Sequence, residues 1–256
     1  MTFSSTKELP IAWKIVGELS PYFVVFLLIL SQSSVGRELN TYSINYKASA
    51  GLATASATRS FLKSTTNSYE LLNTIEVSAA AQSIMNITER SKITLSESQQ
   101  LIPLSYSMRQ TGYIDKSVNI EFDWVQPIAT ISTAEQSQTV KIEDQIFDKL
   151  SHQLFIHSNI RETTNKISFN IIDESGIQEY RYIVLGYEDI ETPLGQFSSI
   201  KIERNLPKSS SRSVIFWLSS EWEGILLKMD QVINGIITVT LEIQEGRVNG
   251  KSITGR

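Results

Sequence analysis

The feature that most limits how this chain can fold is an alternation of apolar and polar residues that recurs from Leu39 onward. It is clearest in the segments 117–124, 166–171 and 237–243, where every second residue is apolar. Successive side chains of a β-strand point to opposite faces of its sheet, so one face of each segment suits a core and the other suits water. The chain shows no long alternation of helices with strands, which disfavours a parallel α/β sheet. The pattern predicts a mainly β protein with antiparallel strands.

Short turn motifs separate the alternating segments. Asn234-Gly235 joins two of them through residues that both tolerate a positive φ, which is typical of a hairpin. Asp173–Gly176 and Thr192–Gly195 also have turn chemistry, and for the second we favour a structural role because Pro193 fixes one φ angle. We expect about ten or eleven strands. They are drawn from the following spans, of which some merge or fail: 40–47, 53–63, 67–78, 87–96, 103–112, 117–124, 127–133, 166–172, 177–187, 198–205, 212–219, 225–232 and 236–244.

One segment departs from the alternation. Between Asp144 and Asn159, apolar residues and His157 recur at spacings of three and four, which predicts an amphipathic helix. Asp144 and Asp148 could suggest a metal site, but acids in the first turn of a helix are favourable because they face the positive end of its dipole. We therefore expect an up-and-down antiparallel sheet curled into a barrel or half-barrel, with the helix plugging one opening.

The N-terminal segment has the layout of an export signal. The nine-residue apolar run Tyr22–Leu30 follows Lys7 and Lys14 and precedes a stretch of small residues, with Gly36 at the last position before a possible cleavage site. The run is shorter than the roughly 20 residues that cross a bilayer. We expect residues 1–36 to be a signal peptide of a periplasmic protein, or else an uncleaved inner-membrane anchor through residues 19–36. We expect one β-barrel-like domain over residues 37–245 and a flexible tail over 246–256.

Composition excludes several classes of function. The 256 residues contain no cysteine, which excludes a disulfide scaffold, thiolate metal sites and a cysteine nucleophile. An exported chain without cysteine suits a bacterial envelope better than a eukaryotic secretory route. The net charge of -4 argues against a nucleic-acid partner, which would require concentrated positive charge. No cofactor is expected.

The candidates for catalytic chemistry are weak. His152 and His157 are five residues apart, roughly 140° around a helix, so they cannot share a metal as residues four apart do. We interpret His152 as a surface partner of Asp148 and His157 as a packed side chain. The segment Gly250–Ser252 resembles the end of a phosphate-binding loop, but the glycine required five residues earlier is missing, and we dismiss it.

Acidic and aromatic clusters give equally limited indications. Glu188, Asp189 and Glu191 could bind calcium, but a solvated turn explains them better. A carboxylate pair made of Glu221 and Glu223 lacks partners across a cleft. Two tryptophans could line a ligand cavity, although a core position is the more common role of an inward-facing tryptophan: Trp124 and Trp217. We assign no catalytic, ligand-binding or metal residue.

Several stretches together resemble a family of exported bacterial proteins called domain of unknown function 3108. They are VNIEFDW at Val118–Trp124, ETPLGQFSSIKIER at Glu191–Arg204, VIFWLSSEWEGILLKM at Val214–Met229, and the opening Tyr42–Ala55. The sequence departs from the family pattern at Leu226-Leu227, where Pro-Val is more usual. The resemblance implies a β-rich, barrel-like exported domain and no particular reaction.

Three hypotheses follow. The first is a non-catalytic envelope protein whose curved sheet binds an apolar or amphipathic ligand such as a lipid, a glycan or a lipoprotein. The second is a structural or adaptor protein of an envelope complex, with no ligand cavity. The third is a hydrolase that uses two carboxylates facing across a pocket. The expected partners are a lipid or an envelope protein, and a membrane only if the N-terminal segment is uncleaved.

Overall fold

The computed structural model describes residues 39–50, 53–65, 67–79, 82–143, 145–160, 165–207 and 210–256, with only the backbone described at 50 and 157. The predicted signal or anchor segment, residues 1–36, lies outside the described residues. The elements are β1 Tyr42–Ala50, β2 Ala53–Lys63, β3 Ser68–Ala79, β4 Gln82–Leu95, β5 Leu101–Gly112, β6 Lys116–Asp123, β7 Ile128–Thr133, β8 Ser137–Lys141, β9 Ile146–Phe147, α2 His152–Asn159, β10 Lys166–Asp173, β11 Gly176–Thr192, β12 Gly195–Arg204, β13 Ser213–Ser219, β14 Leu226–Ile233, β15 Ile237–Val248 and β16 Lys251–Ser252.

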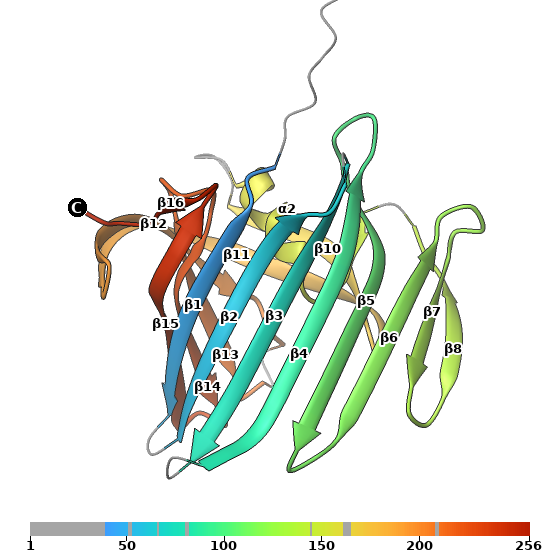
Figure 1. Cartoon of the computed structure of the whole chain (residues 1–256), viewed down its shortest axis with the longest axis horizontal. Helices are drawn as coiled ribbons and strands as arrows, with labels where there is room; N and C mark the ends of the chain where they lie inside the picture. The colour runs from blue at the N-terminus through green and yellow to red at the C-terminus, as the bar shows by residue number, and fades with distance from the viewer. Residues whose placement is uncertain are drawn as a thin grey trace, which may run out of the picture. The chain divides into compact units, whose positions relative to one another are not determined.

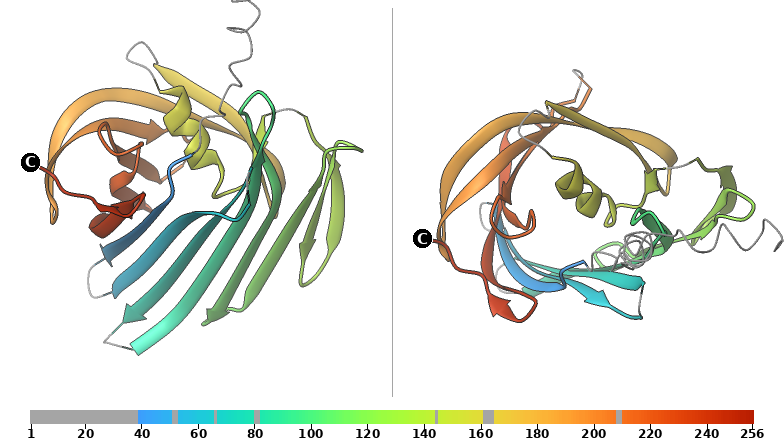
Figure 2. Two further views of the ribbon diagram at one scale, coloured as in Figure 1. Left: turned by 45° about the horizontal axis from the view of Figure 1, so that its top comes forward. Right: turned by 90° about the horizontal axis from the view of Figure 1, so that it is seen from above.

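All strands belong to one sheet. Its order is β8-β7-β6-β5-β4-β3-β2-β1-β15-β14-β13-β12-β11-β10-β9, and β16 pairs with β15. Neighbouring strands are antiparallel except β9 and β10. The sheet curls strongly and keeps helix α2 inside the curl (Figure 1, Figure 2). Its two ends, β8 and β9, do not pair with each other, so the sheet is an open barrel and the predicted fold class is confirmed.

The turn motifs account for the tightest connections. Asn234 and Gly235 both adopt positive φ, 54° and 68°, between β14 and β15. In the turn between β11 and β12, the Thr192 hydroxyl donates to the Gly195 carbonyl (3.0 Å) and accepts from the backbone N–H of Leu194 (3.1 Å). Both hairpins were predicted from these residues, and both are confirmed.

The strands were predicted in the right places, but the predicted number of strands was too low. Each expected span overlaps a strand, but the short strands β8, β9 and β16 were missed. Strand β11 also continues five residues beyond the expected end at residue 187, to Thr192. The polar residues near its end face water on both sides, so they do not alternate. The alternation of apolar and polar residues does not predict a strand where a hairpin extends beyond the packed part of the sheet into water.

The predicted helix over Asp144–Asn159 is wrong in its first half. Helix α2 begins only at His152, while Ile146 and Phe147 are extended and pair with β10. Asp148 ends the extended piece because its carboxylate accepts the backbone N–H groups of the next turn, 2.8 Å from Leu150 N. Asp148 therefore lies outside the first helical turn, which contains no acid. Asp144 lies outside the described residues.

The core occupies the inside of the curl. The apolar side of α2, with Phe155, Ile156 and Ile160, packs against β10 and β11 through residues that include Phe169 and Tyr182. A second cluster lies under β2–β7, and a third joins β1 and β15 to the segment around Ile225. The helix is therefore a plug held from the inside, as the sequence predicted.

The C-terminal tail is packed rather than loose, which corrects the expectation for residues 246–256. Ile253 is 3% exposed and lies against Gly246, where an added Cβ would be 2.6 Å from the Ile253 Cδ1 atom. The backbone N–H of Gly255 donates to Leu194 O at 2.8 Å, in the turn between β11 and β12. The tail lost its alternation because it bonds to a turn instead of extending as a long strand.

Replacing Ile253 by alanine tests this packing. The substitution leaves a cavity over Gly246 and should lower the free energy of unfolding by about 2–4 kcal/mol. The matched control is Ser252→Ala, since Ser252 is exposed and its removal should change little. Urea denaturation of both variants measures the difference, and equal stability of the two would show that the tail does not support the fold.

Candidate functional site

The strand registers define which side chains share the inner face of the sheet. Directly opposite residues of an antiparallel pair lie on the same face. Starting from Val77 on β3, the registers connect one inward residue on each of seven strands from β4 to β13. We call this set the apolar row, because every member is apolar: Met85, Val77, Ala55, Ala48, Leu241, Met229 and Phe216.

The apolar row is only partly covered by protein. Ala48 is buried, whereas the other members are half-buried. Met85, Val77, Ala55 and Met229 belong to none of the three hydrophobic clusters of the described residues. On the same strands nearer α2, several inward residues, among them Leu71 and Phe61, are 2% exposed or less. The inner face is therefore densely packed near the helix and incompletely covered away from it.

The less covered part of the inner face lies toward one end of the sheet. The C-terminal ends of β1 and β3 and the β5–β6 turn lie at this end, at the bottom of Figure 1, and α2 lies toward the other end. The register of β15 with β1 places the β14–β15 turn at the same end. Exposed apolar side chains occupy two of these turns, with Tyr113 88% exposed and Ile236 86% exposed. This end is apolar both inside and at its rim.

Toward α2 the inner face becomes polar. Asp148 is fully buried, and its carboxylate accepts from the Ser91 hydroxyl at 2.6 Å and from the backbone N–H groups of Leu150 and Ser151 at 2.8 and 2.9 Å. Burial raises the pKa of Asp148, and the hydrogen bonds act in the opposite direction. The carboxylate thus ties β4 to the turn that begins the helix.

A second inward carboxylate is also held by donors. Glu89 on β4 accepts from Asn73 Nδ2 at 2.8 Å and from the Tyr106 hydroxyl at 2.7 Å. Burial and the neighbouring Glu89 raise the pKa of Tyr106, so this phenol stays protonated and remains a donor. Inward carboxylates exist, as the hydrolase hypothesis requires, but Asp148 is inaccessible and both carboxyl groups serve as hydrogen-bond acceptors within the wall.

His152 lies inside the curl, which corrects its interpretation as a surface residue. It is 8% exposed, its Nδ1 lies 3.3 Å from Asp148 O, and its Nε2 lies 3.3 Å from the Tyr182 hydroxyl. Burial, together with the smaller effect of the Arg59 and Arg204 charges, lowers the pKa of His152 to about 3. The imidazole is neutral at pH 7, with Nδ1 as donor and Nε2 as acceptor. The side chain of His157 lies outside the described residues.

Two arginines also face the inside. Arg59 on β2 lies opposite the buried Ile44 and Asn73, and its Nη1 donates to Gln153 of α2. Arg204 on β12 lies opposite Tyr182, and its guanidinium stacks on Tyr180 at 3.6 Å from the ring centroid. Sequence analysis missed both, although each stands where the alternation of its strand requires an apolar residue. That break in the pattern was the available signal.

The two tryptophans have different environments, and neither lines an inner cavity. Trp217 is buried on the outer face, where Lys201 and Lys228 lie over its ring at 5.0 and 5.2 Å and its Nε1 donates to Glu188 at 2.5 Å. Trp217 is 7% exposed, so it is buried as the core interpretation expected, although it is packed on the outer face. Trp124 packs against the cluster under β2–β7, and its Nε1 donates to Pro103 O at 2.7 Å.

The acidic candidates do not converge. Glu188, Asp189 and Glu191 lie on β11 rather than in a turn, and the hydrogen bond from Trp217 lowers the pKa of Glu188. Glu221 and Glu223 lie in the turn after β13. Across the described residues, no group of three or more histidines and acids could hold a metal ion. Residues 250–252 form a tight turn and the strand β16, so they do not cradle a phosphate.

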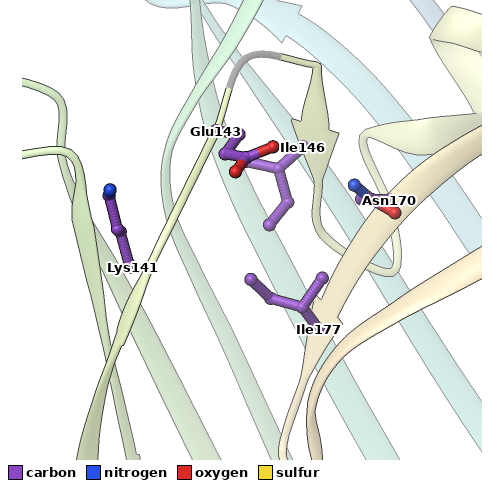
Figure 3. A pocket seen from close by; sticks show the side chains of 5 residues that line it. All are labelled: Lys141, Glu143, Ile146, Asn170 and Ile177. Carbon is purple, nitrogen blue, oxygen red and sulfur yellow. The ribbon is translucent and has the colours of Figure 1, made fainter.

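One small pocket lies at the open seam of the sheet (Figure 3). Its volume is about 250 Å³, and side chains from β8, the following linker, β9, β10 and β11 line it: Lys141, Glu143, Ile146, Asn170 and Ile177. This volume lies below the roughly 300–1,000 Å³ of typical ligand sites. Its one lysine and one glutamate come from the same short stretch of chain. We assign no function to it.

Comparison with known proteins identifies the family. Residues 41–242 match the model of the family described as "Protein of unknown function (DUF3108)". The chain belongs to the DUF3108 family. The match confirms the resemblance found in the sequence, and the DUF3108 region covers the sheet from β1 into β15. A comparison with curated proteins finds no match.

The fold of this DUF3108 protein is similar to that of a solved structure. A beta-barrel-like protein of domain of unknown function DUF1849 from Brucella abortus is similar with a TM-score of 0.55 and 9% identity, over 82% of this chain and 98% of that one. A putative lipoprotein from Parabacteroides distasonis gives a TM-score of 0.31 and 10% identity, over 82% and 96%. The first likeness supports the barrel-like architecture and nothing further.

The neutral, buried state of His152 predicts how stability depends on pH. Above pH 6.5 the imidazole is neutral in both the folded and the unfolded chain. As the pH falls below 6.5, the unfolded chain binds a proton that the folded chain does not, so the stability falls by ~1.4 kcal/mol per pH unit until the pH approaches the folded pKa of about 3. Denaturation between pH 7 and pH 4.5 measures this slope.

The variant His152→Phe is the matched comparison. It retains a ring beside Phe169 and Tyr182 but cannot be protonated. Its stability should be lower at pH 7, because the Tyr182 hydroxyl loses an acceptor, and should decline less steeply on acidification. An unchanged slope would show that His152 does not titrate as its burial implies.

Substitutions of Asp148 test the tie between β4 and α2. Asp148→Ala leaves three buried donors without an acceptor and should lower the free energy of unfolding by about 2–4 kcal/mol. Asp148→Asn keeps one oxygen for the two backbone N–H groups and should cost much less. Urea denaturation of the two variants provides the comparison, and equal losses would mean that the carboxylate does not act as a shared acceptor.

Proposed function

We propose that this protein is a non-catalytic, exported envelope protein that binds an apolar or amphipathic ligand on the inner face of its curled sheet. The observation that carries the proposal is the apolar row, whose members are inward-facing, half-buried in the main and partly outside the hydrophobic clusters. Inward apolar side chains normally complete a core, and an apolar surface left accessible inside a curl is typical of a binding site.

The residue sizes in the row support this proposal. Its middle members, Ala48 and Ala55, are small, while Met85, Met229 and Phe216 at its sides are large and two of them flexible. Small side chains in the centre of a curved wall leave room above them, and methionines adapt to ligands of irregular shape. Covering such a surface with a hydrocarbon chain contributes roughly 0.8 kcal/mol for each buried methylene.

The rim suggests the direction of entry. Tyr113, Ile114, Ile236 and Ile237 are more than half exposed in turns at the end where the apolar row is least covered. Apolar side chains concentrated at one end of a protein favour contact with a lipid surface or an apolar partner. A ligand would enter at this end, while α2 occupies the other part of the inside.

Export is supported by the sequence of the N-terminal segment. The apolar run Tyr22–Leu30 and the small residues after it have the layout of a signal, and residues 1–36 as an uncleaved anchor remain the alternative. Within the described residues, no helix combines the length and the hydropathy needed to cross a membrane. We propose a periplasmic location for the folded part on the basis of this N-terminal segment.

A neutral apolar dye tests the binding function directly. The fluorescence of N-phenyl-1-naphthylamine should rise on addition of the full-length protein, because the dye leaves water for the apolar row. Val77→Glu places a carboxylate in the middle of the row and should weaken binding at least tenfold. The matched control is Thr74→Glu on the outer face of the same strand, which should bind as the unmodified protein does.

Native mass spectrometry of the gently purified protein complements this titration. A bound species with the mass of a lipid, released by Val77→Glu and retained by Thr74→Glu, supports the proposal. If the dye does not bind, or binds both variants equally, the inner face is not a ligand site. The adaptor hypothesis would then be favoured, and capture of a single envelope protein by the exposed rim would be its first test.

A further inference from the structure

We infer that the ligand is an acidic amphiphile, a lipid whose anionic headgroup lies between Arg59 and Arg204 and whose hydrocarbon chain covers the apolar row. This inference rests on the proposed binding function and adds the charge of the ligand and the residues that recognise it. Two inward guanidinium groups without carboxylate partners, on the two walls that flank α2, carry the inference.

Arg59 is an incompletely satisfied cation inside the curl. Its side chain is half-buried, and its Nη1 donates to Gln153. Its Nε atom is buried and has no hydrogen-bond partner among the described residues. A buried donor without an acceptor costs free energy, and more so when the donor belongs to a charged group. An anionic oxygen placed beside Arg59 would remove this cost.

Arg204 approaches from the opposite wall. It lies beside Tyr182 on β11, and its guanidinium stacks on the face of Tyr180. Stacking holds a guanidinium flat while leaving its N–H groups free to donate in the plane. The ion pairs among the described residues include neither Arg204 nor Arg59.

The first turn of α2 connects the surroundings of the two arginines. Gln153 bonds to Arg59, and the neighbouring His152 bonds to Tyr182, which lies opposite Arg204. These contacts bring both arginines to the same turn of the helix, and both charges lower the pKa of His152. A neutral imidazole adds no positive charge, so the two guanidinium groups give this region a net excess of two positive charges before any carboxylate is considered.

The nearest inward carboxylates do not neutralise this charge. Asp148 is fully buried beneath the start of the helix and accepts from Ser91 and two backbone N–H groups. Glu89 accepts from Asn73 and Tyr106, and it lies two strands from Arg59, roughly 10 Å at the usual strand spacing. Each carboxylate accepts hydrogen bonds from other donors. The N–H groups of the two arginines, apart from Arg59 Nη1, therefore remain able to donate to a ligand.

The spacing along β2 connects the charged and the apolar parts. Arg59 and Ala55 are four residues apart on the same face, a separation of about 13 Å along a strand. A molecule with an anionic group at Arg59 and a hydrocarbon chain directed along β2 would reach the apolar row. A compact anion such as phosphate would occupy only the charged part, so the geometry favours an amphiphile.

Displacement of N-phenyl-1-naphthylamine from the full-length protein tests the inference. Dodecanoate and dodecyl phosphate should displace the dye at concentrations at least tenfold lower than dodecanol does, because charge-assisted hydrogen bonds add to the same chain contacts. Acetate and inorganic phosphate should not displace it. In the double variant Arg59→Gln/Arg204→Gln, the two anions should lose at least tenfold in affinity, while dodecanol changes less than twofold.

Two controls separate charge from structure. Arg109→Gln removes an exposed arginine on the outer face of β5 and should bind all probes as the unmodified protein does. Arg59→Lys/Arg204→Lys retains the charges and should keep the preference for the anions in reduced form. The comparison of dodecanoate with dodecanol on the unmodified protein decides the question even if a glutamine variant fails to fold.

The possible results distinguish this inference from the proposed function. If dodecanol displaces the dye as well as dodecanoate does, the inference is wrong and the binding function stands. If the unmodified protein does not bind the dye and native mass spectrometry finds no lipid, both fail together. If acetate or phosphate alone binds as tightly as the long-chain anions, the site recognises a free anion and the lipid is rejected.

Discussion

The pairing of β1 with β15 is the interaction on which the remaining architecture depends. Without it the chain would form two separate antiparallel meanders, one running from β1 to β8 and the other from β10 to β15 with the parallel strand β9 at its edge. The ladder between Tyr42–Ser49 and Thr240–Val248 joins them into one sheet that curls around α2. Because the chain lacks cysteine, no disulfide reinforces this ladder, and side-chain contacts such as those of Ser91 with Asp148 and of Lys116 with Glu174 add to it. The C-terminal tail reinforces the junction through Ile253, which packs with Ile44 and Ile243 in the cluster of β1 and β15.

In a curled sheet that does not close, the inward side chains must be covered by other parts of the chain, because no complete ring of strands encloses them. One part is filled by α2 and its aromatic neighbours, and there the inward polar groups are paired, as in the contact between Ser91 and Asp148. The remaining part keeps the apolar row. A chain selected only for stability would place a larger apolar residue where the half-buried Ala55 stands, since a packed core contributes more than a partly open one. The small residue at this position is consistent with the ligand-binding role that we propose for the inner face.

The sequence predicted the features of the fold that depend on residues close together along the chain. The strands follow from period-two alternation, and the hairpins at Asn234-Gly235 and Thr192–Gly195 follow from residues that tolerate or fix particular φ angles. The start of α2 could not be predicted, because its position depends on Ser91, which lies 57 residues before Asp148. The surface interpretation of His152 failed for the same reason, since its neighbours Phe169 and Tyr182 come from other strands.

In the candidate site, a charged residue interrupts an otherwise apolar inward face of β2. Along β2, Ala53, Ala55, Ala57 and Phe61 form the inward face, and Arg59 interrupts it. Taken alone, a charged residue in an apolar face is a defect of the pattern. On a curled sheet the same residue projects inward, where an unpaired guanidinium is stable only near water or an anion. The partial exposure of Arg59 and its position above the apolar row then make one interruption of the alternation the most informative residue of the inner face.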